Sequence, residues 1–391
     1  MRIALFTETF LPSTDGIVTR LVATLSLLKT YGHEVAIVAP EGGPESYLGY
    51  PVYPVPGVPY FFYPQQRFSW PIHGVGTFLD HFRPDVVHVV NPLMLGLGGI
   101  IYARMRGLPL VGSFHTNLAA YTHRYGIGFI EPFSWWVMRT LHAQSTVNLA
   151  TSRAMVAELR AHGFPRMRLW AGGVDTELFH PDKRDEAMRV RLLGRSGQAD
   201  QVLLYVGRIA PEKQLDRLRS LLDAFPRLAL AFVGDGPDRV RLEKVFTHPR
   251  AHFLGSLHGS ELATAYASAD GFIFPSTTET LGLSLFEALA SGLAIVAATS
   301  PPSKEIVEGA QAGILFSAND QESLHDSVKV LLENRTLRVQ WCQNARQAAL
   351  KSNWEDPTDQ LIKTYELAVR AHHTCQLGVR QTRRTTLIEV T

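Results

Sequence analysis

The sequence has few cysteines, no long apolar run and almost no net charge, and each of these shortages excludes a class of protein. Cys342 and Cys375 are the only cysteines among 391 residues. Two are too few for a disulfide framework or a cysteine-rich zinc site, so a reducing compartment is expected. No run reaches the roughly 18 apolar residues of a membrane-spanning helix. The net charge of +2 provides no strong field for binding nucleic acid.

Three motifs are also missing. Residues 1–10, MRIALFTETF, lack the long apolar core and small-residue cleavage site of a signal peptide and instead suit a first strand. The G-x-G-x-x-G fingerprint is absent, which argues against a dinucleotide-dependent oxidoreductase. No Asp-x-Asp pair is present either, so neither a bound metal nor a permanently bound cofactor is expected.

What the sequence does contain is a repeated alternation of short apolar runs with helical patterns. Arg2–Thr7 reads as a buried strand, and the next helical pattern leads to a second strand at Val35–Val38. The same rhythm begins again at Gln201–Val206, which follows a charged stretch over 181–200. The length allows two or three domains. The pattern therefore predicts an α/β protein with two doubly wound parallel sheets.

The stretch Phe274–Val296 combines a strand, a polar loop, a helix that should end at Gly292, and another strand. Earlier in the chain, Ser152 is expected to cap an amphipathic helix that runs to Gly163. Two carboxylates lie in the stretch 274–296, Glu279 at the loop–helix junction and Glu287 eight residues later. On a continuous helix they would share a face about 12 Å apart and could grip an elongated ligand. The amides of Thr280, Leu281, Gly282 and Leu283 would suit phosphate oxygens. An ordinary pair of surface glutamates is the alternative.

Four further residues lie just beyond the carboxyl ends of predicted strands, where α/β proteins bind ligands. Gly16 follows the first strand and could let its backbone approach a ligand, or it could be a plain turn glycine. His115 follows the strand Leu108–Gly112 and could be structural or catalytic. Arg208 and Lys213 flank the loop after Gln201–Val206. As a pair they could hold a diphosphate, although single surface cations are common.

Two aromatic segments stand out in the first half of the chain. Tyr53–Trp70 includes Phe61 and Phe62, and its prolines disfavour a central strand or regular helix, so a loop is expected. Gly128–Ala143 reads as a helix with Ile130, Phe133, Val137 and Leu141 on one face and Trp135 and Trp136 off it. Both segments could pack on their own domain or could contact a membrane.

Two motifs resemble those of the family-4 retaining glycosyltransferases. The run from Glu279 to Gly292 matches the family's Glu-x7-Glu signature, and Gly207–Lys213 resembles its diphosphate-binding segment. The resemblance implies the GT-B fold, with two Rossmann-like domains facing a cleft. It implies an N-terminal acceptor-binding domain at 1–175 and a donor-binding domain at 176–355. Residues 356–391 would form a helix crossing back to the first domain, followed by a disordered tail.

The same resemblance implies a role for each candidate residue. Arg208 and Lys213 would hold the diphosphate of a nucleotide sugar, together with Gly16 and the 280–283 amides. His115 would lie near the transferred sugar, Glu279 would bind sugar hydroxyls, and Glu287 would bind the ribose. No carboxylate is placed as a nucleophile, so front-face retention is expected, with the leaving phosphate helping to deprotonate the acceptor.

A narrower resemblance covers the N-terminal half. Phe6–Pro12, Asp15–Arg20, His88–Pro92, Ser113–Thr116 and Gly172–Phe179 look like segments of the bacterial sulfoquinovosyldiacylglycerol synthases. This implies transfer from UDP-sulfoquinovose to diacylglycerol by a cytoplasmic enzyme that is peripheral on the inner leaflet. Phe61, Phe62, Trp135 and Trp136 would contact the membrane. Transfer of mannose or glucose to a lipid or other acceptor, and a non-catalytic sugar- or nucleotide-binding module, remain alternatives.

Overall fold

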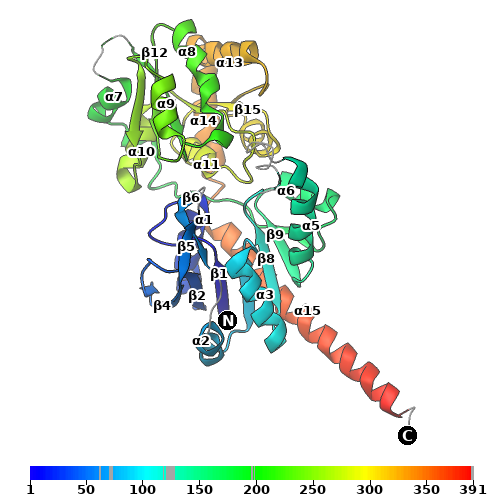
Figure 1. Ribbon diagram of the computed structural model, residues 1–391. Coiled ribbons are helices and arrows are strands. Elements are labelled where there is room, and N and C mark those ends of the chain that lie inside the picture. Colours follow the sequence, from blue (N-terminus) through cyan, green and yellow to red (C-terminus); the bar gives the residue numbers. More distant parts are fainter. Residues whose placement is uncertain are drawn as a thin grey trace. The chain divides into compact units, whose positions relative to one another are not determined.

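The computed structural model describes residues 1–60, 63–69, 74–117, 119, 128–194, 197 and 199–388, without the side chains of 58–60, 63–69 and 375–388. The chain forms two compact units, each built from a parallel sheet and helices (Figure 1). Unit 1 comprises residues 1–116, 130–171 and 355–391, and unit 2 comprises 117–129 and 172–354. Besides the segment 117–129, the chain passes from one unit to the other at 171/172 and at 354/355.

The sheet of unit 1 has the strand order β10-β9-β8-β7-β1-β2-β4-β3, and only the edge strand β3 is antiparallel. Its central strands are buried and mostly apolar because both faces of the sheet are covered, with His88 of β7 and Ser113 of β8 among the few polar exceptions. The strands are β1 (Arg2–Thr7), β2 (Glu34–Pro40), β3 (Ser46–Tyr47), β4 (Tyr50–Val55), β7 (Val86–Val90), β8 (Leu110–Phe114), β9 (Val147–Ala150) and β10 (Met167–Leu169).

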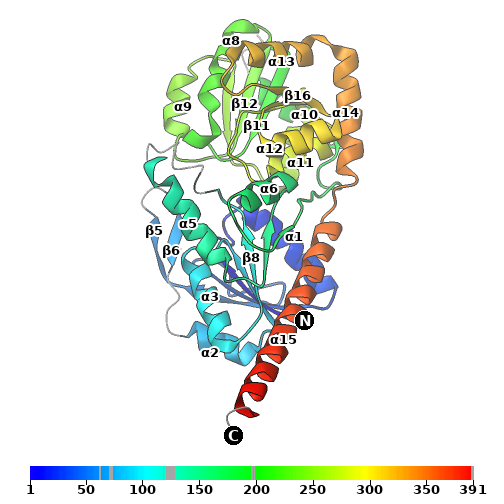
Figure 2. The ribbon, with the colours of Figure 1, turned by 90° about the vertical axis from the view of Figure 1, so that its right-hand side faces the viewer.

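Alternate residues of β1 enter two different cores. Ile3 and Leu5 pack with α1 and α15, whereas Ala4 and Phe6 pack with α2 and α3 on the opposite face (Figure 2). This is the two-residue period of a strand that is buried on both sides. The helices of this unit are α1 (Gly16–Thr30), α2 (Val75–Phe82), α3 (Met94–Arg106), α5 (Glu131–His142, preceded by the 3₁₀ turn η1, Gly128–Ile130), α6 (Arg153–Ala161) and α15 (Glu355–Ile388).

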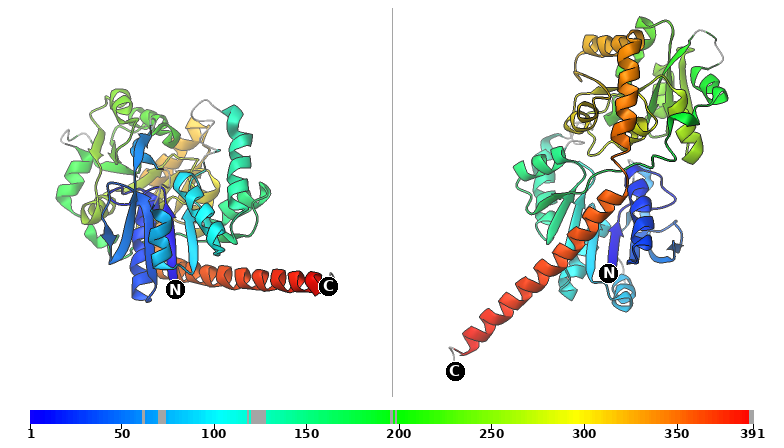
Figure 3. Two further views of the ribbon diagram at one scale, coloured as in Figure 1. Left: turned by 60° about the horizontal axis from the view of Figure 1, so that its bottom comes forward. Right: turned by 180° about the vertical axis from the view of Figure 1, so that it is seen from behind.

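Helix α15 is longer than expected. It packs against α1, β7 and β8, and Figure 3 shows it crossing the sheet of unit 1 and continuing beyond it. The expectation of a disordered tail is wrong for residues 374–388, which continue the helix. Gln, Leu and Arg make up seven of these fifteen residues and favour helix even without a periodic apolar pattern, although four threonines there do not.

The segment Tyr53–Trp70 is not a loop. Its first residues end β4, which pairs in parallel with β2, and the next form the antiparallel hairpin of β5 (Gly57–Tyr60) and β6 (Tyr63–Ser69). The prolines are tolerated because β4 has only the two-residue β3 on its outer side, and the hairpin stands apart from the main sheet. Phe61, Phe62 and Trp70 lie outside the described residues.

Unit 2 has an all-parallel sheet of order β13-β12-β11-β14-β15-β16. Its strands are β11 (Gln201–Val206), β12 (Leu228–Val233), β13 (Ala251–Gly255), β14 (Gly271–Phe274), β15 (Ile295–Ala298) and β16 (Gly313–Phe316). The helices are η2 (Pro181–Lys183), α7 (Glu186–Leu193), η3 (Pro211–Lys213), η4 (Leu215–Leu218), α8 (Arg219–Ala224), α9 (Arg239–Val245), α10 (Gly259–Ser268), α11 (Leu283–Ala290), α12 (Pro301–Ser303), η5 (Lys304–Glu308), α13 (Gln321–Glu333) and α14 (Arg335–Ala349).

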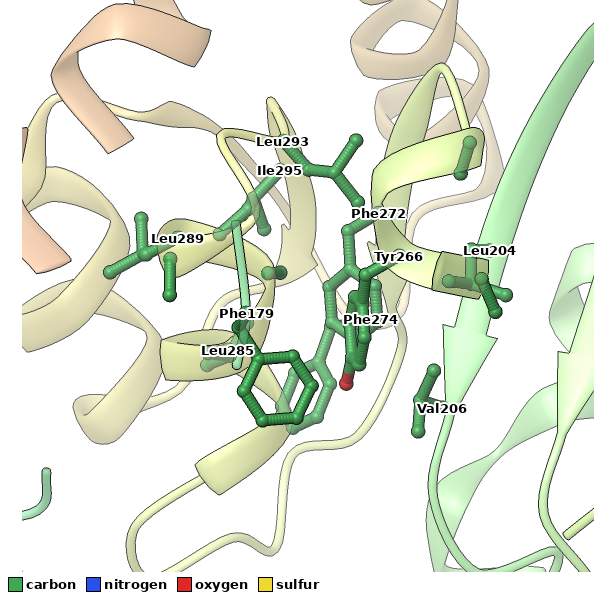
Figure 4. Close-up of a cluster of buried hydrophobic side chains, with 14 of the residues drawn as sticks. Phe179, Leu204, Val206, Tyr266, Phe272, Phe274, Leu285, Leu289, Leu293 and Ile295 are labelled. Carbon is green, nitrogen blue, oxygen red and sulfur yellow. The ribbon is translucent and has the colours of Figure 1, made fainter. Parts of the chain in front are cut away.

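Strand β11 again supplies alternate residues to two cores. Leu204 and Val206 join the aromatic cluster that contains Tyr266 and Phe272 (Figure 4), while Leu203 and Tyr205 face the core under η4 and α13. Both faces of the sheet are thus covered, and the carboxyl ends of the strands are left to carry polar side chains. The doubly wound α/β prediction is confirmed for both halves of the chain.

Candidate active site

The carboxyl ends of β11 and β12 approach each other through glycines. A Cβ atom at Gly234 (φ +132°) would lie 2.0 Å from the carbonyl oxygen of Gly207, so no larger residue fits there. Arg208 comes directly after Gly207, and its guanidinium pairs with Glu212, whose side chain is fully buried. The tight crossing of the two backbones therefore fixes the base of the loop that carries Arg208 and Lys213.

Lys213 forms an ion pair with Glu279, which lies 66 residues later in the sequence. Two neighbouring contacts join the same two loops: Gln214 Nε2 donates to Thr277 Oγ1 at 3.0 Å, and Thr278 Oγ1 donates to Glu212 O at 3.5 Å. The structure thus brings together a cation and a carboxylate that the sequence could only place separately.

The surroundings of Tyr205 show that the four charged side chains of these two loops lie close together. Its hydroxyl donates to Arg208 O at 2.9 Å, and its ring is buried. Burial raises the pKa of this hydroxyl, and Lys213, Glu279, Glu212 and Arg208 each act on that pKa electrostatically. Two cations and two carboxylates therefore surround the carboxyl end of β11.

Glu287 lies on α11 and accepts a hydrogen bond from the Tyr266 hydroxyl at 2.8 Å. Figure 4 shows the ring of Tyr266 between the aromatic side chains of this cluster. Desolvation raises the pKa of Glu287 to about 7, and the Tyr266 hydrogen bond partly offsets that rise. A neutral-to-ionised change at this carboxyl therefore falls within the physiological range.

The start of α11 corrects part of the sequence argument. The helix begins at Leu283, and Gly282 precedes it in the left-handed conformation with φ +76°. Thr280, Leu281 and Gly282 therefore belong to the loop, and of the four expected amides only that of Leu283 opens the helix. Glu279 is not on the helix, so a separation from Glu287 calculated along one helix does not apply. Gly292, at φ +67° just after the helix, ends it as expected.

In unit 1, His115 lies immediately after β8 and is buried. Its Nε2 is 2.9 Å from Ser113 Oγ, its backbone N–H donates to Asn91 Oδ1 at 2.8 Å, and its ring makes an edge contact with Trp170. Desolvation is the largest cause that lowers the pKa of His115 well below its usual value, and the Arg20 guanidinium adds to this effect. The imidazole is therefore neutral at physiological pH.

Gly16 is the exposed first residue of α1. Asp15 caps this helix by accepting from the amides of Ile17 at 2.9 Å and Val18 at 3.1 Å. Thr9 and Ser13 hydroxyls also donate to Asp15, at 2.7 and 3.1 Å. The turn that presents Gly16 is thus held by a capping network.

Helix α5 is oriented differently from the expectation. Its buried residues are Met138 and His142, and Trp135 stacks on His162 with ring centroids 3.9 Å apart. Phe133, expected on the opposite face from Trp136, is 63% exposed and stacks on Trp136, which is 53% exposed. The exposed aromatic face of α5 is therefore Phe133 and Trp136. No helix among the described residues is long and apolar enough to cross a membrane.

Two polar residues near these sites were missed by the sequence analysis. Glu8 accepts from the Gly96 amide at 3.0 Å at the start of α3, and desolvation raises its pKa to about 7. Arg20 is buried, lies over the Trp170 ring at 4.3 Å and donates to the carbonyl oxygens of Trp170 and Ala171. Glu8 could have been singled out because it directly follows the first strand. Nothing in the sequence signalled that Arg20 is buried.

Family models and curated relatives agree on the class of this protein. Residues 14–178 match the model described as Glycosyltransferase Family 4, and residues 194–348 match Glycosyl transferases group 1. A sulfoquinovosyl transferase of Arabidopsis thaliana is 35% identical over 92% of this chain and 72% of its own length. The chain belongs to the family-4 glycosyltransferases. The resemblance seen in the sequence is confirmed, and the chain is a glycosyltransferase that acts on a nucleotide sugar.

Other relatives differ in what their names say they use. A GDP-mannose-dependent alpha-mannosyltransferase of Mycobacterium tuberculosis is 36% identical, covering 96% of this chain and 99% of its own. An alpha-monoglucosyldiacylglycerol synthase of Streptococcus pneumoniae is 27% identical over 85% of this chain and 78% of its own. Sequence identity therefore does not separate the sulfoquinovosyl and mannosyl relatives.

The fold comparison agrees with the family. Sucrose-phosphate synthase from Thermosynechococcus elongatus matches with a TM-score of 0.75 at 17% identity, covering 95% of this chain and 99% of that one. Anabaena HepE, solved in complex with UDP-glucose, matches with a TM-score of 0.74 at 18% identity, covering 94% and 99%. The fold is GT-B, with two Rossmann-like domains as expected.

Proposed function

We propose that this enzyme transfers sulfoquinovose from UDP-sulfoquinovose to diacylglycerol with retention of the anomeric configuration. The observation that carries the donor half of the proposal is the gathering of Arg208, Lys213 and Glu279 at the carboxyl end of β11. Two cations there suit a diphosphate, and the carboxylate beside them suits sugar hydroxyls. Unit 2 would accordingly be the donor domain and unit 1 the acceptor domain.

In this proposal the Lys213–Glu279 ion pair opens when the donor binds. Lys213 and Arg208 turn to the diphosphate, with the amides of residues 280–283 beside it, and they stabilise the charge that grows on the leaving phosphate. Gly16 of unit 1 remains a proposed donor-binding residue. Glu279 then binds the sugar, and Glu287 accepts hydrogen bonds from the ribose hydroxyls in its ionised form. The leaving phosphate helps to take the acceptor proton on the same face.

His115 has a different part in the proposal. It would lie near the transferred sugar, as the family resemblance implies. Because its pKa is well below the physiological range, it would act there as a neutral hydrogen-bonding group and would not supply positive charge. The positive charge that the leaving group requires comes from the cations of unit 2.

The acceptor half of the proposal is supported by names and by one surface. Two of the similar proteins are named as a sulfoquinovosyl transferase and as an alpha-monoglucosyldiacylglycerol synthase. The exposed face of α5 presents Phe133 and Trp136, which suit the interfacial region of a bilayer. We propose that the enzyme is cytoplasmic and works as a peripheral protein on the inner leaflet, where diacylglycerol is available.

Mannosyl transfer from GDP-mannose is the second candidate. It is favoured by the Mycobacterium tuberculosis relative, because this chain covers 99% of that protein. The two candidates share the diphosphate and differ in the base, the sugar and the acceptor, so they predict different products from the same preparation.

The test is a donor comparison on the purified enzyme with diacylglycerol in mixed vesicles. UDP-sulfoquinovose, GDP-mannose and UDP-glucose are supplied one at a time, and the lipids are analysed by mass spectrometry. We expect a sulfoquinovosyl lipid from the first donor, with the α-anomer identified by NMR. A mannosyl product, with none from UDP-sulfoquinovose, overturns the sulfolipid proposal in favour of the second candidate. No product from any of the three donors overturns the proposal that diacylglycerol is the acceptor.

A further inference from the structure

A chain of four polar side chains links helix α15 to His115 inside unit 1. The Tyr365 hydroxyl lies 2.7 Å from His88 Nδ1, His88 Nε2 lies 3.0 Å from Ser113 Oγ, and Ser113 Oγ lies 2.9 Å from His115 Nε2. Tyr365 and His88 are separated by 277 residues in the sequence, and all four side chains are buried.

The proton count along this chain has one consistent solution. Among the described residues, His88 is the only hydrogen-bond partner of the Tyr365 hydroxyl, so the hydroxyl satisfies its proton only by donating to Nδ1. His88 must then carry its own proton on Nε2 and donate it to Ser113 Oγ. Ser113, having accepted there, donates its proton to Nε2 of His115. The other possible acceptor of the Ser113 proton, Val89 O, lies at 3.5 Å, the outer limit for a hydrogen bond.

If the hydrogen bonds ran in the opposite direction, the proton of the buried Tyr365 hydroxyl would have no acceptor among the described residues. If Ser113 donated to His88, then His88 Nδ1–H would donate to the Tyr365 oxygen. The Tyr365 proton would then have no acceptor among the described residues. A buried unsatisfied donor costs about 1–3 kcal/mol. The chain of bonds therefore runs from Tyr365 toward His115.

We propose that Tyr365 is a positioning residue that fixes the tautomer of His115 through His88 and Ser113. His115 then accepts at Nε2 and carries its proton on Nδ1. The neutral state that this requires agrees with the low pKa of both histidines: desolvation lowers the pKa of His88 to about 3, and that of His115 is also lowered well below its usual value. Trp170, in ring contact with both imidazoles, holds them in place.

This inference deepens the proposed function and rests on it for its catalytic meaning. With Nε2 engaged by Ser113 and Nδ1 protonated, His115 has no lone pair with which to remove a proton. Its part in the proposed reaction is then orientation, and proton transfer is left to the phosphate.

NMR spectroscopy tests the tautomer of His115 directly. The enzyme is labelled with ¹⁵N-imidazole histidine, and long-range ¹H–¹⁵N spectra are recorded for the wild type and for Tyr365→Phe, with His115→Gln to assign the signal. We expect the Nδ1–H form of His115 in the wild type. In Tyr365→Phe the donor is gone, and an Nε2–H population should appear. The value of kcat should fall about three- to tenfold, as for one lost neutral hydrogen bond, with little change in KM for the donor.

The matched control is Tyr50→Phe. Tyr50 is also buried in unit 1 and donates to a backbone oxygen, His33 O at 2.9 Å, outside this chain of side chains. It should leave both the tautomer and kcat unchanged. An Nε2–H signal for His115 in the wild type, or an unchanged signal in Tyr365→Phe, overturns the proposal. If Tyr365→Phe does not fold, Ser113→Ala breaks the same chain and should give the same mixture of tautomers. Because the spectra are recorded without substrate, their result does not depend on which sugar the enzyme transfers. A failure of this proposal is therefore distinguishable from a failure of the proposed function.

Discussion

The candidate residues of unit 1 are neutral and enclosed, whereas those of unit 2 are charged and paired with one another. In unit 1, desolvation holds His88 and His115 in their neutral forms, and a chain of hydrogen bonds orients them. In unit 2, Lys213 is paired with Glu279, and Arg208 with Glu212. The first arrangement keeps its geometry without a ligand. In the proposed function, the second exchanges partners when the donor binds.

The difference suits the two kinds of chemistry that the proposed reaction combines. A leaving diphosphate needs positive charge, and carboxylates can hold that charge in place until the donor binds. A sugar hydroxyl near the reacting carbon needs only orientation, which a neutral imidazole of fixed tautomer provides. The contrast makes distinct predictions for variants in the two units.

The largest effect is expected at Lys213. Lys213→Ala should lower kcat by about 100-fold or more, because it removes a preorganised cation from the leaving group. It should also weaken binding of the nucleoside diphosphate in calorimetry. Glu279→Gln should slow turnover but bind the diphosphate as tightly as the wild type or tighter, because Lys213 is then released from its carboxylate.

Arg191→Ala is the control for this pair. Arg191 pairs with Glu261 at 2.6 Å in the same unit, but both side chains are about half exposed, so the loss should stay within about 1 kcal/mol of stability. Kinetics equal to wild type are expected. Retention of a tenth or more of wild-type turnover in Lys213→Ala would contradict the assignment of Lys213 as a diphosphate ligand.

A smaller effect is expected in the pH dependence of stability, which should differ between the two units. In unit 1, desolvation lowers the pKa of His142 to about 4 from 6.5, so the unfolded state binds more protons and stability is lost as the pH falls below 6.5. In unit 2, the pKa of Glu287 is raised from 4.5 to about 7, so the folded state binds more protons between these values. The stability that the protonated Glu287 carboxyl group contributes is therefore lost as the pH rises toward 7.

The corresponding variants should flatten opposite parts of the stability profile. His142→Gln is expected to make the free energy of unfolding less sensitive to pH below 6.5, and Glu287→Gln less sensitive between 4.5 and 7. Denaturant titrations at half-unit pH intervals measure both. If both variants lose the pH dependence of the free energy of unfolding over the same pH interval, the electrostatic difference between the units is contradicted.

The smallest effect on stability is expected at the exposed aromatic face of α5. The double change Phe133→Ser with Trp136→Ser should alter the free energy of unfolding by no more than about 0.5 kcal/mol per site, because both side chains are largely exposed. It should nevertheless weaken flotation with vesicles. Trp135→Ser, by contrast, should destabilise the protein because Trp135 stacks on His162.

Val240→Ser is the control in unit 2, since Val240 is 67% exposed on α9. It should leave flotation unchanged. If the α5 double variant floats like the parent protein, or the parent binds no vesicles, the proposed membrane contact is wrong and a water-soluble acceptor becomes the better proposal.

The sequence by itself determined the features that depend on neighbouring residues. The alternation of apolar runs and helices predicted both sheets, and the caps at Ser152 and Gly292 were visible because a capping bond reaches only three or four residues along the chain. The two motifs at Gly207–Lys213 and Glu279–Gly292 identified the family, which the comparisons confirmed.

Only the tertiary structure determined which distant residues contact one another and which face of a helix is exposed. The pairing of Lys213 with Glu279 and the link from Tyr365 to His88 join residues 66 and 277 positions apart, and no local pattern encodes such contacts. On helix α5 the sequence separated Phe133 from Trp136, but the two side chains stack on each other on the exposed face, because apolar residues occur on several sides of this helix. The stacking of Trp135 on His162, a residue outside the helix, fixed its orientation. Burial also set the protonation states, since removal from water is the largest cause of the pKa shifts of His115 and Glu287.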